Sequence, residues 1–476
     1  MKTIIYILIG FSLFFSMELL SQVPDKQEEE KASKHFKRLM ESSHPTPKKR
    51  PVTLKYLTPQ SSSDSSSIFI NLNAIDDEAG MYYKMQNESS IAINPLNLMN
   101  LIASAVDYRD NSASWVYVSS DGGRNWVNLN LGRPYPNWRA SNDPSVAFDA
   151  EGTGYLVYGG HGSAYDSLGM SFGENGVFIS KTTDEGKTWK AHIPVIVHRG
   201  KQSLDSNYED KYYITVDNSP NSPYFKHIYI PWKRVVPRDS STTIVLSKST
   251  DKGETWSEPI AISERFSGSS EDTTYGQSFP LAATGPNGEV YVVWNNGIEH
   301  SIGFVVSYDG GATWTEPRMI FNSNIFGETR YLEGQGWRHS VKKVVRCEAY
   351  PVLQCDLSNS ERRGWLYLTW AADNYPNIYF SRSTDHGQTW SDRVIVHSDT
   401  TNDQFWQWHG VDQSNGDIAV MFLDSRNDPN NIAIETYVSY SSDGGNTWVD
   451  KRVSDVTSDL RLNPFDGNSF AGDYSG

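Results

Sequence analysis

One eight-residue motif recurs six times in this chain, and its spacing constrains the fold more than any other feature of the sequence. Each copy has a hydroxyl residue at position one, Asp at position three, Gly at position five and Trp at position eight. The copies occupy residues 119–126, 182–189, 249–256, 307–314, 383–390 and 441–448. Their Asp residues are separated by 63, 67, 58, 76 and 58 positions. A period of this length suits one four-stranded sheet with its connections.

Each copy is predicted to form a hairpin turn rather than a site of chemistry. The Asp and hydroxyl side chains can accept hydrogen bonds from backbone amides of the turn, and the Gly supplies a positive φ. The Trp ring can be buried beside the turn. We therefore expect a structural role for the six aspartates, which are Asp121, Asp184, Asp251, Asp309, Asp385 and Asp443.

Short β-rich runs lie between the motifs and are bounded by Gly, Asn, Asp and Pro, as antiparallel sheets require. Examples are residues 155–158, 177–180, 290–294, 366–370 and 418–422. Helical periodicity is confined to a charged segment near the start of the chain. The sequence therefore predicts an all-β fold, and six sheets of roughly 60 residues would use most of the chain after about residue 80.

The motif is the one known as the Asp box, and the chain resembles the Asp-box (BNR repeat) β-propellers of the sialidase superfamily from about residue 85 to residue 476. The resemblance implies a β-propeller of about six four-stranded blades, or seven, with the boxes on the rim and away from the central pocket. The sequence stops at Gly476, directly after an inner-strand signal. Either the last segment closes the ring, with residues 68–72 as a further closing strand, or part of another blade is missing.

The N-terminal 80 residues are predicted to lie outside the propeller. Residues 1–22 contain Lys2 and an apolar run that is too short for a comfortable membrane span, which is typical of a signal peptide. Residues 23–80 are rich in charge and Ser and are predicted to be a propeptide or linker. Residues 81–476 then form the propeller. We expect a secreted, periplasmic or cell-surface protein without a membrane span.

Charge and composition narrow the class of partner. A formal net charge of −15 argues against nucleic acid. It would also repel an acidic sugar unless basic residues gather in the pocket. The 13% aromatic content suits a pocket in which sugars stack, so a glycan is the expected partner. The 11 His are scattered, and no Cys and His cluster has metal-ligand spacing, so we expect no metal and no cofactor. The oligomeric state is not predicted.

The two cysteines, Cys347 and Cys355, lie eight positions apart in a chain that is expected to be exported. Antiparallel neighbours, or the two ends of a loop, could bring them within disulfide distance. A disulfide is the favoured expectation, with two thiols as the alternative.

The resemblance also implies catalytic residues. Sialidases use a Tyr nucleophile, activated by a Glu, with an Asp as acid and base and three Arg residues on the substrate carboxylate. Guanidinium groups match a carboxylate, and a neutral phenol is not repelled by an anionic sugar. The matching catalytic residues here are Tyr474, Glu348 and either Asp107 or Asp110, and the matching substrate-binding residues are Arg109 and Arg426.

The chain also departs from the sialidase pattern. Residues 87–95 lack the Arg that leads the Arg-Ile-Pro segment of the first blade, and residues 294–296 read Trp-Asn-Asn where an Arg-Asn pair is expected. We favour a sialidase-like exo-glycoside hydrolase that acts on an acidic sugar. One alternative is a non-catalytic propeller that binds glycans or proteins at the cell surface. Another is a uronate polysaccharide lyase in which His409 takes a proton, assisted by Tyr474 or Arg338.

Overall fold

The computed structural model describes residues 86–108, 113–162, 173–200, 202–203, 205–236, 238–239, 241–266, 276–297, 299–332, 336–343, 345–373, 375–462 and 472. Within these ranges the fold is all-β, as predicted, apart from short 3-10 turns such as Leu460–Leu462. The predicted signal peptide, residues 1–22, and the predicted propeptide or linker up to residue 80 lie outside the described residues.

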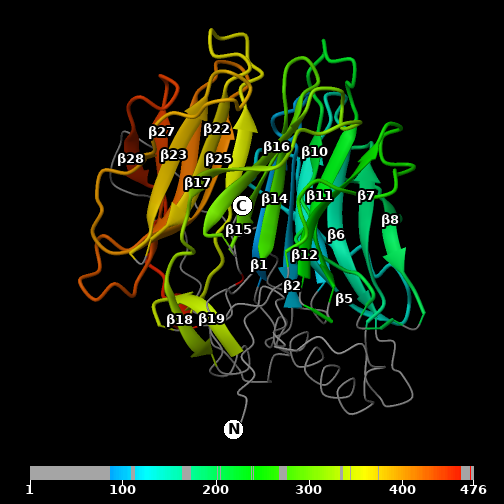
Figure 1. The fold of residues 1–476 in the computed structure, drawn as a ribbon, viewed down its shortest axis with the longest axis horizontal. Helices are drawn as coiled ribbons and strands as arrows, with labels where there is room; N and C mark the ends of the chain where they lie inside the picture. Colours follow the sequence, from blue (N-terminus) through cyan, green and yellow to red (C-terminus); the bar gives the residue numbers. More distant parts are fainter. Residues whose placement is uncertain are drawn as a thin grey trace.

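Six antiparallel sheets follow one another along the described chain, and in each a run of four consecutive strands pairs in sequence order (Figure 1). The third sheet has one further short strand at its start, which pairs out of sequence order. The first sheet contains β1 (Gln86–Ile93), β2 (Leu101–Asp107), β3 (Ala113–Ser119) and β4 (Val127–Leu129). The second contains β5 (Trp138–Phe148), β6 (Gly154–Gly162), β7 (Asn175–Thr182) and β8 (Lys190–His198). The third contains β9 (Tyr208–Asp210), β10 (Thr215–Val216), β11 (Ile228–Val236), β12 (Ser241–Ser249) and β13 (Ile260–Ala261).

The remaining three sheets repeat the pattern. The fourth contains β14 (Gln277–Thr284), β15 (Val290–Asn296), β16 (Ser301–Ser307) and β17 (Arg318–Asn322). The fifth contains β21 (Val352–Cys355), β22 (Leu366–Ala372), β23 (Asn377–Ser383) and β24 (Val394–Ile395). The sixth contains β25 (Gln404–Val411), β26 (Ile418–Asp424), β27 (Glu435–Ser441) and β28 (Val449–Arg452). The predicted four-stranded repeat is thereby observed in the described residues.

A small three-stranded sheet interrupts this order between the fourth and fifth sheets. It contains β18 (Glu328–Leu332), β19 (Gly336–Val341) and β20 (Val345–Arg346). Figure 1 shows β18 and β19 at the bottom of the molecule, apart from the longer strands. We call residues 328–346 the insert sheet.

The Asp boxes are the turns before the fourth strand of each sheet, and they share one hydrogen-bond network. In all six, the hydroxyl at position one donates to Asp Oδ1 at 2.7–2.9 Å. It also accepts from the Gly amide at 2.8–3.0 Å. Asp Oδ1 accepts the amide at position seven at 2.8–2.9 Å. The predicted structural role of the six aspartates therefore has a direct physical basis.

The Gly at position five also fits the boxes against neighbouring sheets. It has a positive φ in every box, from 76° to 90°. A Cβ on the box Gly of the second to sixth sheets would contact a side chain of the preceding sheet. These contacted residues are Val118, Ile179, Tyr229, Phe304 and Phe380. Only a residue without a Cβ meets both demands, so the boxes also set how closely sheets pack.

Three boxes hold a non-Gly residue with positive φ at position four, where the other three have Gly. The residues are Glu185, Lys252 and His386. Asn97 Nδ2 donates to Glu185 Oε1 at 2.9 Å, and Lys252 pairs with Glu151. The His386 ring bonds the Tyr291 hydroxyl at 3.0 Å. Each partner lies in the preceding sheet, so these contacts offset the conformational strain of a left-handed side chain.

The favoured expectation of a disulfide between Cys347 and Cys355 is wrong. Both are buried thiols. Cys347 Sγ donates to the Phe326 carbonyl, and Cys355 Sγ donates to the carbonyl of Asp356. Cys355 is the last residue of β21, and Cys347 lies five positions before that strand begins.

Among the described residues, no helical segment has the length and apolar character needed to cross a bilayer.

The box glycines give the first testable prediction. Gly387→Ala should lower the free energy of unfolding by about 2–4 kcal/mol, because a Cβ both strains the backbone and overlaps the Phe304 ring. Gly200→Ala is the matched control, because Gly200 has a φ of 79° but no atom within 4 Å of an added Cβ. It should cost about 1 kcal/mol. Urea unfolding of both variants measures the difference, and equal losses would contradict the packing role.

Candidate functional site

The first strands of the sheets carry a repeated irregularity that gathers polar side chains. The ladders of β1, β5, β14 and β25 shift register near their starts, and the third sheet breaks between β9 and β10 at the equivalent place. One residue at each of these five places has a positive φ of 47–55°. These residues are Glu88, Asp143, Lys211, Phe279 and Trp406. Such bulges bend a strand and redirect a side chain.

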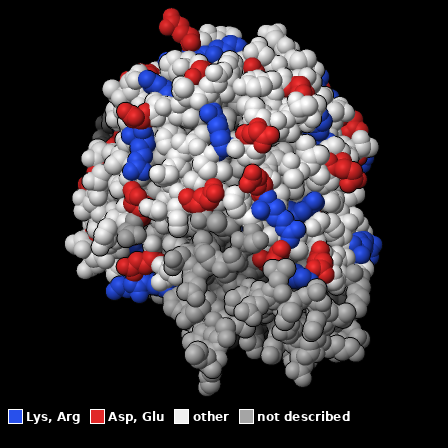
Figure 2. Space-filling model, in the orientation of Figure 1, with Lys and Arg blue, Asp and Glu red and all other residues white. Residues whose placement is uncertain are grey.

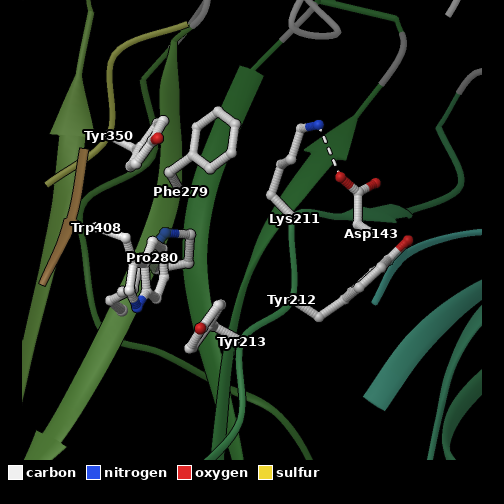
Figure 3. Close-up of a pocket in the computed structure, with 9 residues that line it drawn as sticks. Asp143, Lys211, Tyr212, Tyr213, Phe279, Pro280, Tyr350 and Trp408 are labelled. Carbon is white, nitrogen blue, oxygen red and sulfur yellow. Dashed lines mark hydrogen bonds and ion pairs between the residues drawn. The ribbon is translucent and has the colours of Figure 1, made fainter. Parts of the chain in front are cut away.

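Lys211 joins these bulges to one another. Its Nζ lies 2.8 Å from Asp143 Oδ1 and 3.9 Å from Glu88 Oε1. The same ammonium lies 5.0 Å from the centre of the Phe279 ring. Figure 3 shows Lys211 directed toward Asp143, with Phe279 alongside. One cation therefore contacts the first, second and fourth sheets from its own position in the third, which places it where the sheets converge.

A small cavity lies at this point. Its lining comes from five sheets and consists of Asp143, Lys211, Tyr212, Tyr213, Phe279, Pro280, Leu281, Tyr350 and Trp408. The Tyr213 and Trp408 rings, from the third and sixth sheets, have centroids 5.0 Å apart. The cavity volume is about 20 Å³, which is room for a single water molecule.

Asp210, next to Lys211, is the least satisfied carboxyl group in this region. Its side chain is fully buried, and neither oxygen accepts a hydrogen bond from the described residues. Lys233 Nζ is 4.0 Å from Oδ2. Burial raises the pKa of Asp210 to about 7, against the opposing pull of Lys211. A carboxyl group in this state can still donate a proton near neutral pH.

Further buried charges surround Asp210. Arg346, the last residue of the insert sheet, and Glu348, which follows it, are almost fully buried and lie 3.4 Å apart. Burial, followed by the charge of Glu88, raises the pKa of the nearby Tyr108. We call Glu88, Tyr108, Asp143, Asp210, Lys211, Lys233, Arg346 and Glu348 the central cluster. It contains four carboxyl groups and three cations in a region without exposed surface.

The neighbouring Glu209 contrasts with Asp210. His198 and Trp232 bond its carboxylate at 2.9 and 2.5 Å, and Arg234 binds it with two nitrogens. Burial raises the pKa of Glu209, but the bonds from His198 and Arg234 outweigh burial and the net shift is downward. The surroundings of these two adjacent residues on β9 thus shift their pKa values in opposite directions.

The predicted site residues are only partly brought together. Glu348 lies in the central cluster. Asp107 is buried in the first sheet, where it accepts a hydrogen bond of 2.8 Å from the Tyr117 hydroxyl. Arg426 pairs with Asp424 at 2.7 Å and Asp450 at 2.5 Å, both in the sixth sheet. Tyr474, Arg109 and Asp110 lie outside the described residues, and their roles stay predictions.

His409 has surroundings that do not suit a catalytic base. Its Nδ1 bonds Thr369 Oγ1 at 2.8 Å, between the fifth and sixth sheets. Burial lowers the pKa of His409 to about 3. A base this weak is poorly matched to proton abstraction near neutral pH.

Asp143, Asp210 and Lys211 were missed in the sequence because none belongs to a sialidase motif. Asp143 lies in the middle of β5, Asp210 is the last residue of β9, and Lys211 follows it directly. Glu88, Asp143 and Lys211 lie 33, 41 and 40 positions before the Asp of their own boxes, so aligning the repeats on the boxes alone does not superpose them.

The fold and site can now be compared with known proteins. Residues 237–460 match the family model described as a BNR repeat-like domain. These residues, which are less than half of the chain, carry BNR-like repeats. The predicted resemblance to the Asp-box β-propellers is thereby confirmed. No curated protein resembles this BNR-repeat chain closely enough to count as a match.

Three solved structures resemble the BNR-repeat chain at low identity. A protein of unknown function from Dyadobacter fermentans has 15% identity over 72% of this chain and 91% of its own, with a TM-score of 0.47. A Hadza microbial sialidase has 15% identity over 73% of this chain and 64% of its own, with a TM-score of 0.43. An alpha-L-arabinofuranosidase from Fusarium graminearum has 12% identity over 75% of this chain and 96% of its own, with a TM-score of 0.45. These similarities concern the course of the backbone and assign no activity.

The raised pKa of Asp210 predicts a pH dependence of stability. Its pKa is about 7 in the folded protein and about 3.9 when unfolded, so the folded state binds more protons between these values. The free energy of unfolding therefore falls as pH rises from about 4 to about 7. In Asp210→Asn this fall should shrink, and the urea midpoint at pH 8 should exceed that of the unmodified protein.

Asp143→Asn is the matched control. It removes the carboxylate nearest to Lys211 and should lower the midpoint at pH 8. If Asp210→Asn left the pH dependence of the urea midpoint unchanged, Asp210 would not titrate in this range.

Proposed function

We propose that this BNR-repeat protein is a carbohydrate-active enzyme, a sialidase-like exo-glycoside hydrolase that acts on an acidic sugar at the central cluster. The observation that carries the proposal is Asp210, a buried carboxyl group that keeps its proton near neutral pH beside carboxylates that are ion-paired. Glycoside hydrolysis needs a proton donor of this kind together with an ionised partner.

In the proposed reaction, Asp210 protonates the oxygen of the leaving group as the glycosidic bond breaks. Glu348 accepts the phenolic proton of Tyr474, whose oxygen forms a bond to the anomeric carbon. Water then attacks the anomeric carbon and gives a proton to Asp210, while the bond to Tyr474 breaks and the phenol takes back its proton from Glu348. Asp210 thus takes the place of Asp107 as the proposed acid, because Asp107 accepts the Tyr117 hydroxyl. Asp110 stays an alternative acid. Arg109 and Arg426 are retained as proposed ligands of the substrate carboxylate.

The proposed acidic substrate would have to bind through the cations of the central cluster, which are paired there with carboxyl groups. The chain has a net charge of −15, and Figure 2 shows basic and acidic side chains interspersed over one face. Lys211, Lys233 and Arg346 nevertheless meet in the central cluster. Local cations of this kind are what an anionic sugar would need in order to bind an acidic protein.

A second candidate is a non-catalytic propeller that binds glycans or proteins. The volume of the central cavity favours it, because about 20 Å³ is too little for a sugar ring. In that case the central cluster would be a structural network of paired charges, which also perturbs pKa values.

The proposal extends to the architecture and location of the protein. We propose that the six sheets are blades of a closed ring, since an added Cβ on Gly472 would lie 3.0 Å from Glu88 Cγ and 3.1 Å from Asn87 Cβ, in the first sheet. Closure would protect strand edges. We also propose export through the predicted signal peptide, with residues 23–80 as a propeptide or linker.

The test of function is fluorophore release from sialic-acid, uronic-acid and neutral glycosides by the purified protein. Turnover of an acidic glycoside should fall at least about 100-fold in Asp210→Asn and in Tyr474→Phe. Asp392→Asn, which removes an exposed carboxylate, should have no effect. Turnover in the acid-catalysed step should decline above about pH 7, as Asp210 loses its proton.

Turnover of neutral glycosides alone would make the acidic-sugar assignment wrong. Activity that survives in Asp210→Asn would exclude this residue as the acid. If protein that unfolds cooperatively turned over none of the glycosides, the result would favour the non-catalytic binding propeller.

A further inference from the structure

A second, larger cavity lies between the insert sheet and the sixth sheet. Its volume is about 350 Å³, which is in the range of small-molecule sites. The insert side of its lining consists of Gly327, Glu328, Arg330, Ser340, Val341, Lys342 and Lys343. The opposite side consists of Asp403, Asn430, Asn431, Ile432, Arg461 and Tyr375. We call this cavity the insert pocket, and no residue of the central cluster lines it.

Lys342 fixes the insert sheet to the sixth sheet and so forms the pocket. Its side chain is fully buried. The ammonium donates to Asp403 Oδ2 at 2.8 Å, Ser425 Oγ at 2.7 Å and Asn431 Oδ1 at 2.5 Å. It also lies 5.6 Å from the centre of the Phe405 ring. All three donated bonds go to the sixth sheet and its loops, so one wall of the pocket is held firmly against the other.

The same anchor forces the next residue into an unusual backbone conformation. Lys342 and Lys343 have φ values of 54° and 70° in the turn between β19 and β20. Turns of this kind ordinarily use Asn or Gly, because two consecutive left-handed side chains cost about 1–2 kcal/mol each. Strain of this size persists where the surroundings fix it, and it gathers at functional sites. Here it places Lys343 on the pocket wall while Lys342 stays buried.

The exposed chemistry of the insert pocket suits an anionic sugar. Four of its lining side chains are cationic and two are carboxylates, in a chain that is acidic overall. Arg330 pairs with Glu328, and Arg461 pairs with Asp459. The exposed Lys343 makes no hydrogen bond or ion pair with other described residues, so its charge is available to a ligand. Tyr375, which is 73% exposed, offers a ring face, and Asn430 offers an amide.

We propose that the insert pocket is a binding subsite for an acidic sugar unit of a glycan. In this assignment Lys343 pairs with the sugar carboxylate and Tyr375 stacks on the ring. The insert sheet connects the insert pocket to the central cluster along the chain, because β20 leads directly from the pocket wall to Arg346 and Glu348.

The assignment of an acidic sugar rests on the proposed function for its substrate class, but the pocket can be tested without catalysis. Titration calorimetry with the purified full-length protein would use tetragalacturonate and sialyllactose, with methyl-esterified tetragalacturonate and lactose as neutral counterparts. At least one acidic probe should bind more tightly than its neutral counterpart. Lys343→Gln and Tyr375→Ala should each weaken that binding about tenfold or more.

Two substitutions serve as matched controls. Lys187→Gln removes an exposed ammonium, and Tyr308→Ala removes an exposed ring in the fourth Asp box. Both should leave binding unchanged. Equal affinity for acidic and neutral probes, no binding of either acidic probe, or undiminished binding in Lys343→Gln and Tyr375→Ala would each overturn the proposal. If the protein bound an acidic probe but turned over none of the aryl glycosides, the proposed enzyme would be refuted. The proposed subsite would still be supported.

Discussion

The position of one ammonium group, that of Lys211, depends on every part of the fold being in register. It reaches Asp143, Glu88 and Phe279 from three other sheets only because each first strand is bulged at the same level. A shift of one residue in any first strand would turn its bulge side chain away. A buried ammonium without these partners would be strongly destabilising. The central cluster is therefore as much a constraint on assembly as a candidate site.

The parts of this structure that could be predicted from the sequence are the local ones. An Asp box makes its hydrogen bonds within seven positions, so its residues predict the turn wherever the motif occurs. The central cluster is not local, since Lys211 meets residues 68 and 123 positions away. Glu348 was found through a resemblance. Asp210 could not be found in this way, because its proton affinity depends on burial and on Lys233, which no spacing reveals.

Structure and chemistry occupy different strands in this protein. The boxes precede the fourth strand of each sheet, whereas the bulges lie on the first. The box residues are constrained by packing against the preceding sheet, so they stay similar from repeat to repeat. The bulge residues range from carboxylate to ammonium to aromatic ring, because the backbone alone fixes the bulge. A BNR-repeat match therefore identifies a scaffold and leaves the chemistry to be decided position by position.

The contact of each box with the sheet before it gives the array a direction. Every joint between sheets is head-to-tail, as in an assembly of identical subunits that pair through two different surfaces. In the closed ring proposed above, such a series would stop where the accumulated rotation brings the last sheet back to the first. The number of sheets would then be fixed by the angle that each joint imposes, which is set largely by how closely a glycine lets two neighbours approach.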